Sequence, residues 1–262
     1  MNAIVAGEPG FIFEKMTTAS RSDALEVIQE VFSRREPLSV WTGLGRKDWE
    51  FIVETSYYRA LMKGGISVIA RDAKTNKVVA ASLAVDMYYH LVDDFWGAIE
   101  FFFMGLLDRY PLVSRIADLV YPNSLKLATY AMIGEELMSM WLTRHCPAKS
   151  YPHTKGLVLK DMGVGVLPEY QGRGLAQAMT LMRVRLAAEQ GFHCIVVNCS
   201  NGISQHVYAK SGFKFREKIN YDEFMFGGRL PFVGMRNLYN GQREYSLNLY
   251  DFYLQMPRIN SH

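Results

Sequence analysis

The sequence predicts an α+β fold in which helices cover both faces of a central sheet, an α/β/α layering. Three features of the chain indicate this class. Apolar strand-like runs alternate with helical segments in the second half, a β-hairpin pattern lies in the first half, and a helix begins directly after a glycine-rich turn at residues 171–176. Alternating strands and helices are typical of a sheet that buries its faces under helices.

Local patterns place the elements of the first half. A capping-box-like pattern, in which Ser22 and Asp23 precede Glu26, starts a helix with apolar residues at helical spacing. The polar turn Asp72–Asn76 joins the two strands of the hairpin. The expected elements are a strand over Phe11–Lys15, a helix from Ser22 to about Arg35, a helix over Lys47–Met62, and strands over Ile66–Arg71 and Val78–Tyr88.

In the second half, a hydrophobic run stops at Pro168 and helical periodicity begins at Leu175. Met179, Met182 and Leu186 then fall on the same helical face as Leu175, which predicts a helix packed against the sheet. The expected elements are a helix-like segment over Gly134–Arg144, a strand over residues 162–167, a helix that stops at Gly191, a strand over Cys194–Cys199, a helix from about Asn201, and a strand pair near Phe215–Phe226.

The turn Gln171–Ala176 predicts a binding site for a phosphate group. Glycines let the backbone approach a ligand closely, and the first N–H groups of a helix have no partner inside it, so they can bind an anion. The turn has neither the Gly-x-Gly-x-x-Gly pattern of dinucleotide-binding loops nor the Gly-Lys-Ser/Thr ending of P-loops. For the turn taken alone, a tight connection without a ligand is the alternative.

The turn reads Gln-x-x-Gly-x-Ala from Gln171 to Ala176, after Val-Leu-Pro-Glu-Tyr. This pattern resembles the acetyl-CoA loop of the GNAT superfamily of N-acetyltransferases. The segment Asn201–Phe213 resembles the Asn-x-x-Ala-x-x-x-Tyr-x-x-x-Gly-Phe helix of the same family, and a strand separates the two motifs. The resemblance covers roughly Ile12–Met87 and Leu157–Met235.

The resemblance implies a mixed sheet of about seven strands, whose fourth and fifth strands splay apart, in one domain over residues 1–262. A mostly helical insertion at about 89–152 and a C-terminal tail from about 236 are expected within it. The implied co-substrate is acetyl-CoA, with no metal. The residues implied to bind it are Val164, Val166, Gln171, Gly172, Arg173, Gly174, Leu175, Ala176, Asn201 and Tyr208.

Two shorter segments are similar to the insect-type arylalkylamine (dopamine) N-acetyltransferases of this superfamily. Phe32–Leu38 is similar to their Asp-Glu-Pro-Leu segment, with Arg35 where Asp is usual, and Cys199–Ser204 is similar to their Cys-Ser-x-x-x-Ser segment. Those enzymes acetylate dopamine, tryptamine-like and related amines. The resemblance therefore implies direct attack of a small, arylalkyl primary amine on acetyl-CoA in a ternary complex.

Amine acetylation needs a group that accepts a proton and a group that donates one. The resemblance to the Asp-Glu-Pro-Leu segment implies that Glu36 is the base; on sequence spacing alone, a surface residue paired with Arg34 or Arg35 is favoured. Tyr208 or Ser204, which lie one helical turn apart, is expected to donate a proton or a hydrogen bond to the leaving thiolate. Ser200 is either a catalytic hydroxyl or only the N-cap of its helix. The candidate catalytic residues are thus Glu36, Tyr208, Ser204 and Ser200.

Composition and charge argue against several other classes of protein, namely nucleic-acid-binding, membrane-spanning, metal-binding and secreted proteins. The 29 Lys and Arg residues and 26 Asp and Glu residues give a net charge of +3, spread along the chain, which predicts no nucleic-acid partner. The most apolar segment, Phe95–Leu107, contains Glu100 and is shorter than the about 20 residues that span a bilayer, so no membrane span is expected. Three cysteines without metal-ligand spacing, and a start without signal-peptide character, predict reduced thiols, no metal site and a cytoplasmic protein.

Two other functions fit the same motifs. A peptide or protein N-acetyltransferase needs an open groove for an extended chain. A non-catalytic acyl-CoA sensor or interaction module needs the glycine turn but no base. A small amine is favoured because a long insertion can cover a site, although the insertion could equally form a dimer contact, so the oligomeric state is open.

Overall fold

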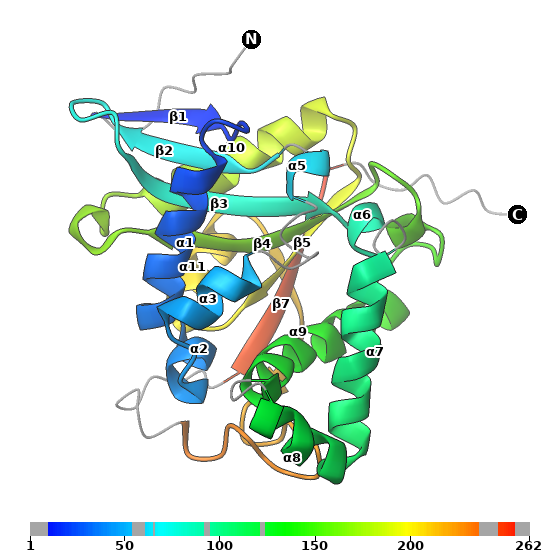
Figure 1. Ribbon diagram of the computed structural model, residues 1–262. Coiled ribbons are helices and arrows are strands. Elements are labelled where there is room, and N and C mark those ends of the chain that lie inside the picture. The colour runs from blue at the N-terminus through cyan, green and yellow to red at the C-terminus, as the bar shows by residue number, and fades with distance from the viewer. Residues whose placement is uncertain are drawn as a thin grey trace, which may run out of the picture.

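The computed structural model describes residues 10–53, 61–64, 66–91, 95–120, 124–235 and 246–254. Its centre is a seven-stranded mixed sheet in the order β1-β2-β3-β4-β5-β7-β6, with helices on both faces, which confirms the expected layering (Figure 1). The strands are β1 (Phe11–Lys15), β2 (Val68–Asp72), β3 (Val78–Asp86), β4 (Val158–Val166), β5 (Cys194–Cys199), β6 (Lys214–Asn220) and β7 (Ser246–Tyr253). The helices are α1 (Arg21–Arg35), α2 (Pro37–Thr42), α3 (Arg46–Ile52), α5 (Leu61–Gly64), α6 (Met87–Leu91), α7 (Phe95–Arg109), α8 (Pro111–Val120), α9 (Ser124–Arg144), α10 (Leu175–Glu189) and α11 (Gly202–Lys210).

The fourth and fifth strands splay apart, as expected. β4 pairs with β3 in antiparallel fashion as far as Val166, but it pairs with β5 in parallel only from Val158 to Asp161. β5 continues to Cys199 alongside β7 instead. Within the described part of the chain, residues 162–166 of β4 therefore have no strand partner on the β5 side. This opening, with Asp161 at its vertex, is called the fork below.

Two glycines of β4 let α1 cross the sheet beside the fork. Gly163 has φ 129°, and a Cβ added to it would lie 2.6 Å from Cζ of Phe32 on α1. A Cβ added to Gly165 would lie 3.1 Å from Cδ1 of Ile28. Because side chains at these positions would collide with α1, the glycines fix its approach, and Glu36 is the residue that follows its last turn.

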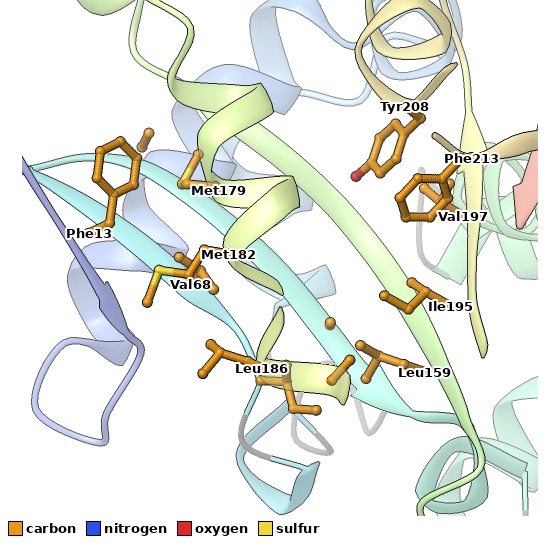
Figure 2. Close-up of a cluster of buried hydrophobic side chains, with 14 of the residues drawn as sticks. Phe13, Val68, Leu159, Met179, Met182, Leu186, Ile195, Val197, Tyr208 and Phe213 are labelled. Atoms are coloured by element: carbon orange, nitrogen blue, oxygen red, sulfur yellow. The ribbon is translucent and has the colours of Figure 1, made fainter. Parts of the chain in front are cut away.

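The opposite face of the sheet carries α10, and its predicted apolar stripe is buried. Met179, Met182 and Leu186 belong to one hydrophobic cluster with Phe13 of β1 and Val68 of β2 (Figure 2). Tyr208 and Phe213 from α11 and its end belong to the same cluster (Figure 2). The cluster therefore joins α10 and α11 to the strands on both sides of the fork.

Several boundaries in the first half differ from expectation. α1 begins at Arg21, with Ser20 and not Ser22 at its N-cap. Ser20 bonds Thr17 rather than a helical N–H, so the capping-box reading was wrong. The helix expected over Lys47–Met62 appears as α3 and α5, and residues 54–60 of that expectation lie outside the described part of the chain. α2 was not expected, because six residues are too few to show a helical period.

The second half contains one wrong pairing. The strand pair expected near Phe215–Phe226 does not form, since β6 pairs with β7 from the expected C-terminal tail. β7 lies between β5 and β6, so the tail supplies an inner strand of the sheet. The helix expected from Gly134 begins ten residues earlier, at Ser124, because Ala128 packs in the core and overrides the weak helix propensity of Thr129 and Tyr130. The strand Cys194–Cys199 is confirmed with both ends in place.

Candidate active site

Glu36 is buried between α1 and α2 and serves as the N-cap of α2. Its Oε2 accepts hydrogen bonds from the backbone N–H of Ser39, at 2.6 Å, and from the Ser39 hydroxyl, at 2.7 Å. Its Oε1 accepts one longer bond, at 3.2 Å, from the Leu38 N–H. The side chain of Ser200, from the far side of the fork, lies close enough to this carboxylate to lower its pKa. Residues from the end of α1 and the end of β5 thus meet at one carboxyl group.

The surface-residue alternative for Glu36 does not hold. Arg34 pairs with Glu30 at 3.1 Å, and Nη1 of Arg35 donates to Oε1 of Gln171 at 3.0 Å, so both arginines turn away from Glu36. Burial raises the pKa of the Glu36 carboxyl, and the hydrogen bonds from Ser39, Ser200 and Leu38 oppose this rise. A carboxyl whose pKa is raised above its ordinary value accepts a proton more readily than an exposed one, which is a property that a general base uses.

The loop between β5 and α11 places two serines. Asn201, and not Ser200, is the N-cap of α11, because its side chain accepts a bond from the Ser204 N–H at 2.8 Å. Ser200 is therefore not the N-cap, and its side chain lies near Glu36 and lowers the pKa of that carboxyl. The Ser204 hydroxyl donates to the Asn201 carbonyl at 2.9 Å, and its proximity to the buried Cys199 thiol lowers the pKa of that thiol against the larger effect of burial.

Tyr208 lies at the vertex of the fork in a buried polar cluster. Its hydroxyl donates to Oδ2 of Asp161 at 2.6 Å, and Arg183 of α10 donates to the same oxygen and to the Ser82 hydroxyl of β3. Oδ1 of Asp161 accepts the N–H of Gly163 at 3.0 Å. Burial raises the pKa of the Tyr208 phenol, and the positive charge of Arg183 acts against this. The cluster ties β3, β4, α10 and α11 together where β4 leaves β5.

The predicted phosphate-binding turn begins at the other end of the fork. Gly172 and Gly174 have φ angles of 74° and 73°, and Gly174 is the N-cap of α10. A Cβ added to Gly172 would meet no protein atom within 4 Å. Nε2 of Gln171 donates to the Val166 carbonyl at 3.0 Å, which fixes the turn to the end of β4. The guanidinium of Arg173 lies over the Tyr170 ring, 5.4 Å from its centroid.

The turn has the conformation that an anion-binding helix start needs. Its glycines adopt left-handed backbone angles that other residues adopt only with strain, and its exposed surface is open to a ligand. Val164 and Val166 lie on the β4 edge of the fork, between this turn and Asp161. The residues predicted to bind acetyl-CoA therefore form a continuous path from the helix start to the vertex.

Two cysteines and two histidines among the described residues do not offer a rival nucleophile or base. Cys194 and Cys199 are buried free thiols, and burial raises the pKa of each. His206, on α11, and His153 are exposed.

No helix of the described residues is both long and apolar enough to cross a membrane.

Residues 109–213 match the family model described as the Acetyltransferase (GNAT) family. The chain has the GNAT fold. Arylalkylamine N-acetyltransferase 2 from Aedes aegypti superposes with a TM-score of 0.65 at 16% identity, covering 94% of this chain and 99% of that one. A putative arylalkylamine N-acetyltransferase 7 from the same mosquito gives 0.62 at 17% identity, with 94% and 88% covered. The polyamine N-acetyltransferase of Drosophila melanogaster gives 0.58 at 13%, with 93% and 99% covered. No curated protein sequence matches at a significant level.

The matched segment runs from the end of α7 to Phe213 and so contains the fork, the glycine turn and α11. Sequence reasoning missed four polar residues of this GNAT-fold site: Ser39, Trp49, Asp161 and Arg183. The last two left a signal, since Asp161 interrupts an apolar strand and Arg183 follows Met182 in the buried stripe of α10. A charged residue in each of two facing apolar surfaces indicates a buried ion pair. Ser39 and Trp49 left no such signal.

Proposed function

We propose that the protein is an acetyl-CoA-dependent N-acetyltransferase that acetylates the primary amine of a small arylalkylamine by direct attack in a ternary complex. The observation that carries the proposal is the buried Glu36 carboxylate at the edge of the fork, held by Ser39 at 2.6 and 2.7 Å, with Ser200 from the end of β5 beside it. A buried carboxylate with a raised pKa and a hydroxyl beside it supply the proton chemistry that amine acetylation needs. The glycine turn supplies a site for the pyrophosphate of the acetyl donor.

The proposed reaction follows from the positions of these groups. An amine with a pKa near 10 arrives as an ammonium ion, and Glu36 accepts one of its protons, which leaves a lone pair for attack on the thioester carbon. A backbone N–H of β4 near Val166 polarises the carbonyl oxygen as negative charge develops on it. The nitrogen–carbon bond forms and the carbon–sulfur bond breaks. The leaving thiolate takes a proton from a donor at the fork, and the second surplus proton of the nitrogen passes through solvent to that donor and restores it.

We propose that Tyr208 donates the proton that the leaving thiolate takes up, with Ser204 as the alternative donor. The Tyr208 hydroxyl lies at the vertex of the fork, and its acceptor Asp161 is already compensated by Arg183. Because Arg183 neutralises Asp161, this carboxylate holds the phenolic proton less strongly. The leaving thiolate can therefore compete with Asp161 for that proton. A phenol is a stronger acid than an alcohol, which favours Tyr208 over Ser204.

A panel assay that follows thiol release from acetyl-CoA tests the proposal. Dopamine and tryptamine are offered beside agmatine, the amine named by the acetylation product of the Drosophila neighbour, and beside short peptides. We expect kcat/KM for the two arylalkylamines to exceed that for agmatine and for peptides by about tenfold or more, a difference of about 1.4 kcal/mol. Thiol release with peptides alone would assign a peptide acetyltransferase instead. Acetyl-CoA binding without thiol release for any amine would assign a sensor.

A further inference from the structure

The Glu36 carboxylate is held by a chain of donors that reaches into the protein core. The Ser39 hydroxyl donates to Oε2 of Glu36 at 2.7 Å, and Nε1 of Trp49 donates to Oγ of Ser39 at 3.2 Å. Ser39 and Trp49 are fully buried, at 0% exposure each. The chain therefore runs from α3 through α2 to the proposed base, away from solvent.

The direction of the Ser39 hydroxyl is fixed by chemistry. An indole N–H can only donate, so Ser39 Oγ must accept from Trp49, and its own proton is left for Glu36. Trp49 is held by two rings set edge to face: Phe32 of α1, with centroids 5.0 Å apart, and Tyr130 of α9, 5.6 Å away. Tyr130 belongs to the insertion, so the insertion contributes to the support of Glu36.

The two oxygens of Glu36 are thereby made unequal. Oε2 accepts two short bonds from Ser39, which occupy both of its lone-pair directions, whereas Oε1 accepts the 3.2 Å bond from Leu38. On the basis of the function proposed above, we propose that Ser39 and Trp49 are positioning residues for the base. Oε2 anchors the carboxylate, and Oε1 accepts the proton of the incoming ammonium ion.

The described side chains that face Glu36 act on its pKa through hydrogen bonds and not through charge. Arg34 and Arg35, at the end of α1, are turned to Glu30 and Gln171. From the fork, Ser200 offers a hydroxyl. Ser39 and Trp49, from α2 and α3, carry no ionisable proton in the working pH range. A shift in the titration of Glu36 after a change in Ser39 or Trp49 therefore reports a lost donor.

The test measures kcat/KM against pH with acetyl-CoA and the best amine of the panel, in Ser39→Ala and Trp49→Phe. Loss of a donor to the charged form raises the pKa of the base. We expect the acidic limb of the profile to move up by about one pH unit in Ser39→Ala, and by a smaller amount in Trp49→Phe. Trp41→Phe is the matched control, since its Nε1 donates to the Pro231 carbonyl at 2.8 Å, and its limb should stay in place.

The position of the limb does not depend on how much of the sample is folded, so a partial loss of stability does not obscure the result. Limbs that stay at the wild-type pH in both Ser39→Ala and Trp49→Phe would overturn the positioning role. Failure of the proposed function gives a different pattern, in which Glu36→Gln retains wild-type turnover and the acidic limb. Equal movement of the limb in Trp41→Phe would also overturn the inference, because the shift would then not follow the Ser39 chain.

Discussion

Replacing Glu36 by Gln tests the proposed base with almost no change in shape. The Gln carbonyl oxygen can take the place of Oε2 and keep both bonds from Ser39, at 2.6 and 2.7 Å. Its amide nitrogen then faces the Leu38 N–H, which lies 3.2 Å from Oε1, so one weak bond is lost. We expect a loss of about 1 kcal/mol or less in the free energy of unfolding. Loss of a general base should lower kcat by about 10²–10⁴.

The assay follows thiol release across a pH range that ends near the pKa of the amine, about 10. The deficit of Glu36→Gln should shrink as pH rises, because solution then supplies the free amine and the base is no longer needed. Glu30→Gln is the control, since Glu30 also lies on α1 but pairs with Arg34 and Arg46. A deficit that is equal at every pH, together with weaker acetyl-CoA binding, would refute the reasoning and make Glu36 a structural cap.

Three further outcomes are expected. Gly172→Val and Gly174→Asp should abolish CoA binding in calorimetry, because the left-handed backbone angle at both positions strains any other residue and a Cβ at Gly172, which meets no protein atom within 4 Å, would take the space of a ligand; wild-type affinity in both variants would remove the turn from the site. Asp161→Asn should lower the free energy of unfolding by about 3–5 kcal/mol, because it leaves the buried Arg183 charge unpaired, and a denaturant titration with an unchanged midpoint would contradict this. Tyr208→Phe should lower kcat more than Ser204→Ala, measured per folded molecule by active-site titration, whereas normal turnover in Tyr208→Phe with a large loss in Ser204→Ala would make Ser204 the donor.

The parts of the fold that local patterns determine were predictable from the sequence. The strand Cys194–Cys199 follows from a short continuous apolar run and the buried stripe of α10 from a period of 3.6 residues, and both are confirmed. The place of β7 could not be predicted in this way. Pairing between Ser246–Tyr253 and strands far back in the chain depends on long-range contacts that no local window contains.

In the candidate site, too, features set by local sequence were predictable, and features set by long-range contacts were not. The glycine turn is a short, contiguous signal, so its geometry was predictable from the residues themselves. The contact between Glu36 and Ser200 joins two distant segments, and only the packing of α1 on Gly163 and Gly165 brings them together. No sequence motif marks the hydrogen-bonded chain of Ser39 and Trp49 behind Glu36. Both residues are buried, and nothing in the sequence distinguishes them from other residues of the core.

The two buried carboxylates at the fork, Asp161 and Glu36, differ in what stabilises their charge, and this difference suits their proposed roles. At the vertex, Asp161 faces the cation Arg183, so its charge is compensated and the cluster can hold strands and helices without changing protonation. At Glu36 the carboxylate is stabilised by neutral donors, and burial keeps its pKa above the ordinary value. A cation in place of Ser39 would lower that pKa and weaken the base. The absence of charge in the Ser39 and Trp49 chain therefore keeps the carboxylate oriented while it remains basic enough to accept a proton from the amine.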